Sequence, residues 1–271
     1  MDVEKNIEFL DVNFWFGENY ISKKLTIFEE DAIKILLERK KSKNIKSTLV
    51  SNFLSFFYSP SIGNDLTNQF LKNEKLQEAG VMGVLFMEQD FFYNPENFEK
   101  WLIKSYKNNF KILRLLPSTH KYPFESSLFA NFYEILNSYN FPIIISIDEL
   151  DITGNKNIRW DELTKIADMY ENMPIILDGG QSKELMYNSF LLSLLNNTSN
   201  IYIETHNLLG LNQIEDLANF KGAERLIFGS YFPFLDDNLA LGRIINSNLD
   251  FKQKNKIASI NIKNIIDNII I

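Results

Sequence analysis

Eight short apolar runs, separated by segments with helical punctuation, constrain the fold of this chain more than any other feature of its sequence. Most of the runs are apolar at nearly every position, as in PIIISI, PIIL and RLIFG, rather than at alternate positions. Such runs are typical of parallel strands that are buried on both faces. We therefore expect strands at residues 7–12, 47–53, 81–87, 110–116, 142–147, 174–177, 200–204 and 225–228.

The segments between these runs carry helix-start signals. We expect helices to begin near Thr26 with Glu29 (a capping box), Asn94-Pro95 (an N-cap followed by proline), Ser182, and Asn212 with Glu215. Residues 256–271 predict a closing amphipathic helix.

The alternation of eight strands with helices predicts an α/β chain folded as a single (β/α)8 TIM barrel, one domain spanning residues 1–271. An open, doubly wound sheet is the competing arrangement. The length of 271 residues suits one such barrel, and no linker, repeat or low-complexity tract divides it.

Composition restricts the classes of partner. The formal charge of −7 and a pI near 5.1 argue against a dedicated nucleic-acid binder, so the basic run Arg39-Lys40-Lys41 is expected to be a solvated helix end. Neither a secretory signal nor a membrane-spanning run is present in the sequence, which predicts a cytoplasmic protein that acts away from membranes. A small-molecule ligand is the expected partner. Whether the protein also forms a homodimer stays open.

In a TIM barrel, functional residues lie at the C-terminal ends of the strands. The side chains that fall there are Asn13, Trp15, Asn52, Glu88, Arg114, Ser146, Asp148, Glu149, Asp178, Glu204, His206, Ser230 and Tyr231.

Several of these segments resemble the amidohydrolase-related family, metal-dependent hydrolases with a TIM-barrel fold. The segments are GAERLIFGSYFPF at 222–234, NIYIETHNLLGL before it, RLLPSTHKYPF at 114–124, FYSPSIGNDLTNQFL at 57–71 and the opening DVNFWFG. The resemblance implies this barrel and hydrolase-type chemistry on a small molecule.

The resemblance also implies where metal ligands would lie, and this chain departs from the pattern. The family's ligand positions fall, in chain order, on Asn13, Trp15, Ser146, either Asp178 or Gly179, and Tyr231. A catalytic zinc needs about three ligands from His, Asp, Glu or Cys, and the chain has two histidines and no cysteine. We therefore expect no transition-metal cofactor, with Mg²⁺ or Ca²⁺ on carboxylates left open.

Arg114 interrupts an apolar strand, so it must be paired or must line a polar cavity. A guanidinium there suits the grip of an anionic substrate group. The alternative is a structural ion pair with Asp148, Glu149 or Glu88.

Asp148, Asp178 and His206 are the expected catalytic residues, because they follow three neighbouring strands and could act as acid and base. Together with Glu204, these carboxylates could instead hold Mg²⁺ or Ca²⁺, or act in glycoside-type chemistry. The structural alternative is that one or two of them cap a helix or pair with Arg114.

Asn13, Trp15, His120 and Tyr231 are expected to bind substrate together with Arg114. Trp15 offers a stacking platform, or simply fills the space that a metal would take. His206 either faces the pocket or packs its loop, and His120 either faces the pocket or is an exposed loop residue.

Two functions remain open at this point. The first is a hydrolase-like protein that acts on a small molecule. If Arg114 anchors that molecule, the molecule is expected to be anionic. The second is a pseudoenzyme that binds a ligand or acts as a scaffold. A pocket plugged by Trp15 and Tyr231, with every charge paired, would favour the second.

Overall fold

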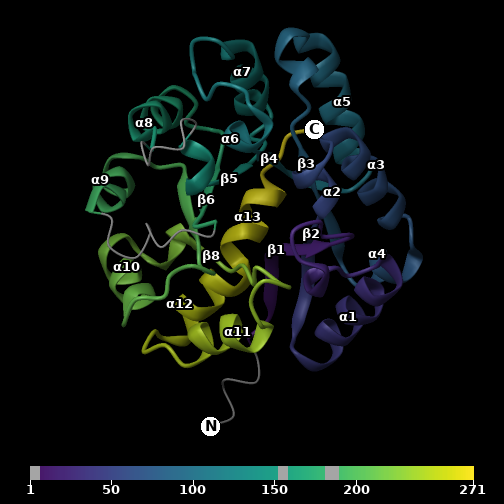
Figure 1. Ribbon diagram of the computed structural model, residues 1–271. Coiled ribbons are helices and arrows are strands. Elements are labelled where there is room, and N and C mark those ends of the chain that lie inside the picture. The colour runs from purple at the N-terminus through teal and green to yellow at the C-terminus, as the bar shows by residue number, and fades with distance from the viewer. Residues whose placement is uncertain (1–6, 152–157, 181–188) are drawn as a thin grey trace.

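The computed structural model describes residues 7–151, 158–180 and 189–271, and it confirms the (β/α)8 barrel. Its eight strands are parallel and follow chain order around the sheet (Figure 1). They are β1 (Phe9–Phe16), β2 (Ile45–Asn52), β3 (Val81–Phe86), β4 (Phe110–Leu115), β5 (Ile143–Ser146), β6 (Ile175–Asp178), β7 (Ile201–Glu204) and β8 (Leu226–Ile227). The predicted start near Ser182 lies outside the described residues.

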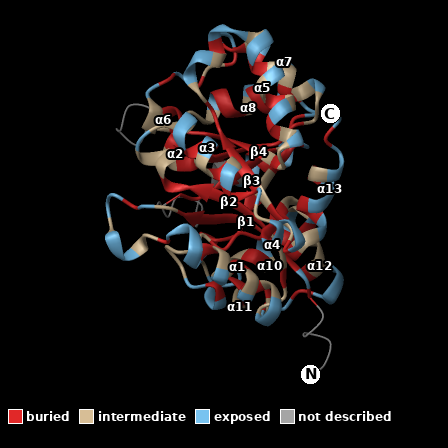
Figure 2. Cartoon of the chain, turned by 90° about the vertical axis from the view of Figure 1, so that its right-hand side faces the viewer, coloured by how far each residue is buried: buried red, intermediate tan, exposed pale blue. Residues whose placement is uncertain are grey.

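Helices cover the outside of the barrel, with exposed residues on their outer faces and buried strands between them (Figure 2). The α-helices are α1 (Glu29–Ser42), α2 (Phe53–Phe57), α3 (Pro60–Phe70), α4 (Glu74–Glu78), α5 (Pro95–Lys107), α6 (Pro117–His120), α7 (Ala130–Ser138), α8 (Trp160–Met169), α9 (Ser189–Asn197), α10 (Gln213–Lys221), α11 (Asp237–Ile245), α12 (Phe251–Asn255) and α13 (Asn261–Asp267). Shorter 3₁₀ segments are η2 (Lys23–Leu25), η3 (Gln89–Tyr93), η4 (Ile147–Leu150) and η6 (Ala223–Arg225), and η7 (Lys256–Ile260) is π-helical.

The expected closing helix is present and packs against the interior of the barrel. Ile262 and Ile265 of α13 belong to the same buried cluster as Leu10, Val12 and Ile227, which line the inside of the strands. In Figure 1 this helix lies across the strands at the centre of the view. One end of the barrel is therefore filled by aliphatic side chains, which leaves the C-terminal ends of the strands to form a site.

β1 is longer than expected, because it continues to Phe16 and is buried throughout. It pairs with β2 on one side, and on the other side the backbone N–H of Trp15 donates to the carbonyl of Phe232 at 2.8 Å. The register contains an extra residue between Asp11 and Phe14. This bulge changes which residues face inward: Leu10 and Val12 do so below it, and Asn13 and Trp15 above it.

Two local expectations were wrong. The predicted capping box does not form, because α1 begins at Glu29 with Phe28 as its N-cap, and the Thr26 hydroxyl accepts from the backbone N–H of Asn19 at 3.0 Å. Arg39 is not solvated: only 1% of it is exposed. By contrast, the Asn94 cap is confirmed, since its side chain accepts from the backbone N–H of Asn97.

Arg39 reaches inward because α1 packs its buried face against β1 and the loop after β8. Its Nη2 lies 2.5 Å from Oδ2 of Asp11, and its Nε lies 3.0 Å from Oδ2 of Asp237. The same Nη2 donates to the hydroxyl of Ser230 at 3.2 Å. We call Asp11, Arg39, Ser230 and Asp237 the closure network, because it joins β1 to the segment that follows β8.

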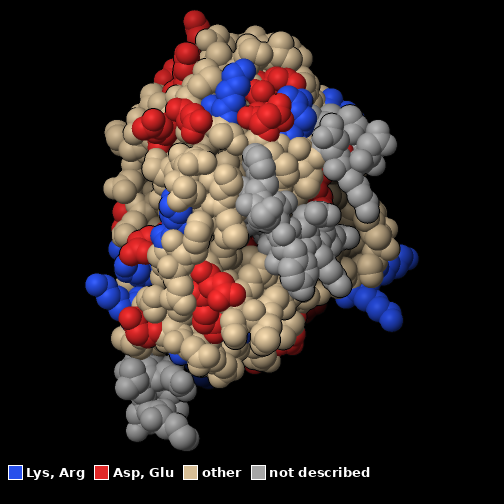
Figure 3. Space-filling model, turned by 90° about the vertical axis from the view of Figure 1, so that its left-hand side faces the viewer, with Lys and Arg blue, Asp and Glu red and all other residues tan. Residues whose placement is uncertain are grey.

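On the surface, acidic and basic side chains are interspersed over the face shown in Figure 3, so its described part has no broad basic area. Among the described residues, no helix has the length and apolar content needed to cross a bilayer.

Candidate active site at the barrel mouth

Four of the predicted residues meet inside the C-terminal end of the barrel. Nη1 of Arg114 lies 2.7 Å from Oδ2 of Asp178, and its Nη2 donates to Oδ1 of Asn13 at 3.2 Å. The indole Nε1 of Trp15 donates to that same Asn13 oxygen at 2.8 Å. Arg114 therefore pairs with Asp178, which confirms the structural alternative given for the strand-end carboxylates, and it does not pair with Asp148, Glu149 or Glu88.

A second ion pair lies next to the first. Nδ1 of His206 pairs with Oε2 of Glu204, the backbone N–H of His206 donates to Oε1 of Glu204 at 2.6 Å, and Asn13 Nδ2 donates to Oε2 at 3.1 Å. Nε2 of His206 lies 3.0 Å from the carbonyl of Gly180, which can only accept. Both ring nitrogens thus face acceptors, as an imidazolium requires.

The pKa shifts agree with this charged arrangement. Burial works to lower the pKa of His206, but the carboxylates of Glu204 and Asp178 outweigh it and raise that pKa above its ordinary value. Burial likewise works to raise the pKa of Asp178, but the Arg114 guanidinium and His206 hold it below its ordinary value. We call Arg114, Asp178, Glu204 and His206 the charged layer; its two cations and two anions balance.

The indole of Trp15 covers the charged layer. The Cζ of Arg114 lies 5.0 Å from the centroid of this ring, and the ring of Phe53 is stacked with it at 5.5 Å. Arg114 is 1% exposed and Trp15 is 4% exposed. An incoming molecule therefore meets the indole before it meets the guanidinium.

Beyond Trp15 lies a cavity of about 270 Å³, which we call the aromatic pocket. It lies at the C-terminal ends of β1, β2 and β8, and six of its ten lining residues are aromatic. The lining residues are Trp15, Asn19, Ile21, Ser22, Leu25, Phe53, Phe56, Phe57, Tyr231 and Phe234. None of them is a carboxylate, a guanidinium, an ammonium or an imidazole.

Tyr231 stands where the aromatic pocket meets the charged layer. Its ring stacks on His206 with centroids 4.2 Å apart, and on Phe234 at 4.5 Å. Its backbone φ is 55°, a left-handed conformation that is uncommon for a bulky residue.

The remaining two predicted residues lie at the edge of this arrangement. Asp148, in η4, faces the backbone of Gly180, since a Cβ built on that glycine would meet Asp148 Oδ2 at 2.3 Å. His120 ends α6 and lies behind the pocket wall, with Nε2 3.3 Å from the carbonyl of Phe56. Burial lowers the pKa of His120.

Sequence reasoning missed part of the pocket wall. The loop after β1 contributes Asn19, Ile21, Ser22 and Leu25, and its sequence carries no recognisable binding motif. Phe234 also went unnoticed, although it follows the family-like GSYFP motif. Phe56 and Phe57, from the aromatic run SFFY at 55–58, also line this pocket.

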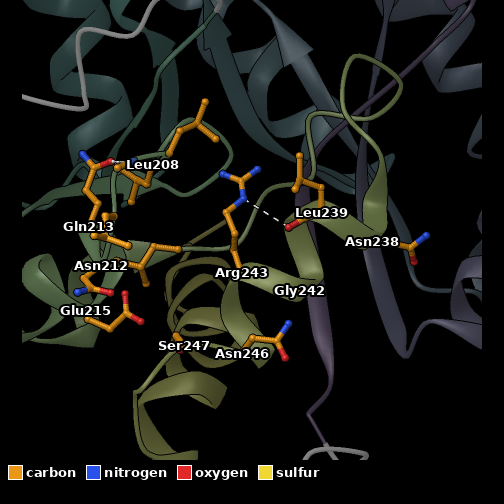
Figure 4. A pocket seen from close by; sticks show the side chains of 14 residues that line it. Leu208, Asn212, Gln213, Glu215, Asn238, Leu239, Gly242, Arg243, Asn246 and Ser247 are labelled. Carbon is orange, nitrogen blue, oxygen red and sulfur yellow. Dashed lines mark hydrogen bonds between the residues drawn. The ribbon is translucent and has the colours of Figure 1, made fainter.

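A larger groove of about 640 Å³ lies off the barrel axis, between the start of α10 and α11 (Figure 4). Arg243 projects into the space between Leu208 and Leu239 there. Its Nη1 donates to the carbonyl of His206 at 2.7 Å, and its Nε to that of Leu239 at 3.4 Å. Arg243 therefore stabilises the loop that carries His206.

Solved structures with the same fold cover nearly the whole chain. A dihydroxybenzoic acid decarboxylase from Polaromonas, holding manganese and 2-nitroresorcinol, aligns with a TM-score of 0.70 and 14% identity over 96% of this chain and 97% of its own. A 5-carboxyvanillate decarboxylase from Novosphingobium aromaticivorans, holding manganese and 4-hydroxy-3-methoxy-5-nitrobenzoic acid, aligns at 0.72 and 10% identity over 97% of both chains. A candidate amidohydrolase from Staphylococcus aureus aligns at 0.70 and 10% identity over 96% and 100%.

The chain has the fold of the amidohydrolase-like TIM barrels. This confirms the fold that the resemblance implied. At 10–14% identity the likeness establishes the fold and leaves the chemistry to be argued from the site. No family model and no curated protein sequence matches the chain.

The expectation of no cofactor is corrected by this comparison, because decarboxylases of this fold hold manganese. A bound manganese ion needs several carboxylate or imidazole ligands close together. In residues 7–151, 158–180 and 189–271, no three or more His, Cys, Asp or Glu side chains lie together in a way that could hold one. Asp178 is engaged by Arg114, and Glu204 by Asn13 and His206, so the described donor set as it stands does not fit manganese.

Proposed function

We propose that this protein binds a small, planar, mainly apolar molecule in the aromatic pocket. The observation that carries the proposal is the wall of six aromatic rings at the C-terminal ends of β1, β2 and β8, where TIM barrels place their ligands. A cavity of about 270 Å³ is close to the lower limit of roughly 300 Å³ for small-molecule pockets, so it suits about one substituted ring.

Electrostatics favours a neutral ring over an anion. The charged layer balances its own charges, and the buried indole of Trp15 separates Arg114 from the pocket. A carboxylate entering the aromatic pocket would lose hydration without gaining a cationic partner, which is costly. A neutral phenol loses less, and Asn19, Ser22 and Tyr231 offer polar groups at the wall.

The related decarboxylases were solved with substituted aromatic rings, 2-nitroresorcinol and a nitrobenzoic acid. A pocket for one ring in this chain agrees in size and shape with ligands of that kind. The proposed ligand differs from the nitrobenzoic acid in carrying no carboxylate, for the reason given above.

The test is a titration with resorcinol as a neutral probe and benzoate as an anionic probe, followed by ligand-observed NMR. Phe57→Ala removes a half-buried ring of the wall and should weaken resorcinol binding roughly tenfold, as loss of a stacked ring commonly does. Phe220→Ala, which removes an exposed ring of α10 outside the pocket, is the matched control and should leave binding unchanged. Equal binding by both variants, or no resorcinol binding by the unaltered protein, would refute the proposal.

A second candidate function is acid–base catalysis by the Glu204–His206 pair. The observation that favours it is a buried imidazole paired with a carboxylate at the C-terminal mouth of the barrel, where that carboxylate raises the pKa of His206. Hydrolysis of neutral aryl esters, assayed with and without manganese, tests this candidate. Turnover that His206→Gln abolishes would support catalysis, and turnover that survives in that variant would reject it.

A further inference from the structure

Tyr231 forms the shared wall between two environments of opposite character. It lines the aromatic pocket, and its ring also covers His206 at 4.2 Å. His206 is 2% exposed and is absent from the described residues that line the pocket. One ring thus lies between a neutral binding space and an ion pair.

The backbone of Tyr231 is held in its unfavourable conformation by its neighbours. A left-handed φ of 55° is unfavourable for a residue other than glycine, so surrounding contacts must hold it. On one side, the N–H and hydroxyl of Ser230 donate to Asp11 at 2.8 and 2.6 Å. On the other side, the carbonyl of Phe232 accepts from the N–H of Trp15 at 2.8 Å.

The closure network fixes these neighbours in turn. Arg39 lies 2.5 Å from Asp11, donates to Ser230, and bonds both oxygens of Asp237 at 3.0 and 3.1 Å. Its guanidinium also lies 4.9 Å from the ring of Phe14, which is stacked on Phe232 at 5.3 Å. The residues on both sides of Tyr231 are therefore held by a buried cation on α1: Ser230 through a hydrogen bond, and Phe232 through Phe14.

We propose that Tyr231 is the selectivity residue of the aromatic pocket, with the closure network as its positioning element. The Tyr231 ring keeps bound molecules away from His206. The pocket therefore accepts neutral rings, and an anionic ring in it has no cationic partner. This inference rests on the proposed function, because it concerns the same pocket.

Tyr231→Gly is the decisive variant, since glycine removes the ring and adopts φ near 55° without strain. Benzoate and resorcinol are titrated against this variant, Tyr231→Phe and the unaltered protein. We expect benzoate to bind Tyr231→Gly at least roughly tenfold more tightly than the unaltered protein, because its carboxylate can then lie against the face of the positively charged His206 ring. Tyr231→Phe keeps the ring and should retain the preference for resorcinol.

The two histidines of the chain give a direct spectroscopic readout. In ¹⁵N–¹H spectra of the imidazoles, benzoate should shift the signals of His206 in Tyr231→Gly and leave those of His120 in place. A benzoate affinity that does not rise in a folded Tyr231→Gly, or benzoate that shifts His206 in the unaltered protein, would overturn the inference.

A measurement without any ring ligand separates this inference from the proposed function. The rate at which the C2 hydrogen of the His206 imidazolium exchanges with deuterated water, followed on its peptide by mass spectrometry, should rise at least roughly tenfold in Tyr231→Gly and stay unchanged in Tyr231→Phe. Ser230→Ala removes the hydroxyl that bonds Asp11 and should give a smaller, fewfold rise. An unchanged rate in Tyr231→Gly refutes the partition, and an unchanged rate in Ser230→Ala refutes the positioning role, whereas failure of resorcinol to bind refutes only the proposed function.

Discussion

The imidazole of His206 lies against the phenol ring of Tyr231, with centroids 4.2 Å apart and planes inclined by 21°. On one side of this contact are two buried ion pairs, and on the other is an aromatic pocket without charged groups. The mouth of this barrel therefore separates its charges from its binding space. The predictions below test the charges, the pocket and the framework that holds them apart.

The pH dependence of stability should carry the signature of His206. Its pKa is raised on folding, so its contribution is fully present below the unfolded value of about 6.5 and is lost as pH rises through the folded pKa. The difference in unfolding free energy between the unaltered protein and His206→Gln should therefore be larger at pH 6 than at pH 9. Urea unfolding at both values measures it.

His120 supplies the matched control, because its pKa is lowered by burial. Its contribution is present above the unfolded pKa and is lost as pH falls through the lowered folded value. The stability difference caused by His120→Gln should shrink on acidification. If the stability differences of both variants changed with pH in the same direction, the protonation states of His206 and His120 given above would be contradicted.

The Arg114–Asp178 ion pair should be strongly coupled. Asp178→Asn leaves a buried guanidinium without its anion and should cost about 3–5 kcal/mol of unfolding free energy. The double variant Arg114→Met with Asp178→Leu should lose less unfolding free energy than the sum of the losses of the two single variants. Asp267→Asn, which breaks an exposed pair with Lys263, should cost about 0.5 kcal/mol or less.

Ring binding in the aromatic pocket should not depend on a divalent metal. The ten lining residues include no carboxylate and no imidazole, so removal of a metal takes nothing from the wall. The resorcinol affinity should be the same in EDTA and in added manganese. A tenfold change would place the ring next to a metal and so outside this pocket.

Arg39 should matter far more than its basic neighbours. Arg39→Met leaves Asp11 buried without its cation and leaves Asp237 paired with Lys43 alone among the described residues, and it should cost about 3–5 kcal/mol. Lys41→Met, on the exposed face of the same helix, should change stability by about 0.5 kcal/mol or less. Thermal or urea unfolding of the two variants compares them directly, and equal effects would contradict the role of the closure network.

The fold was predictable because buried parallel strands leave a continuous apolar signal. Each of the eight expected runs overlaps a strand, and the strand ends identified Asn13, Arg114, Asp178 and His206 as residues of one mouth. The extension of β1 to Phe16 was not visible, because it depends on pairing with Ser51 and Asn52 of β2 and on the bridge from Phe14 to Phe232. The bulge that turns Asn13 and Trp15 inward is a shift in the same β1–β2 register.

Partners were harder to predict than positions. Arg39 sits in a basic run, and only the packing of α1 reveals that Asp11 and Asp237 surround it. The partner of Arg114 could not be chosen from sequence, since several carboxylates end neighbouring strands. The pocket wall from the loop after β1 gave no signal, because small and aliphatic residues such as Ser22 and Leu25 acquire their role only from the shape of the loop.

The most direct test of the central claim is a crystal structure of the protein with resorcinol bound. The account predicts one ring between Trp15, Phe57 and Phe234, with His206 still covered by Tyr231. A ring in the groove beside Arg243, or a ring in contact with His206 while Tyr231 is displaced, would contradict it.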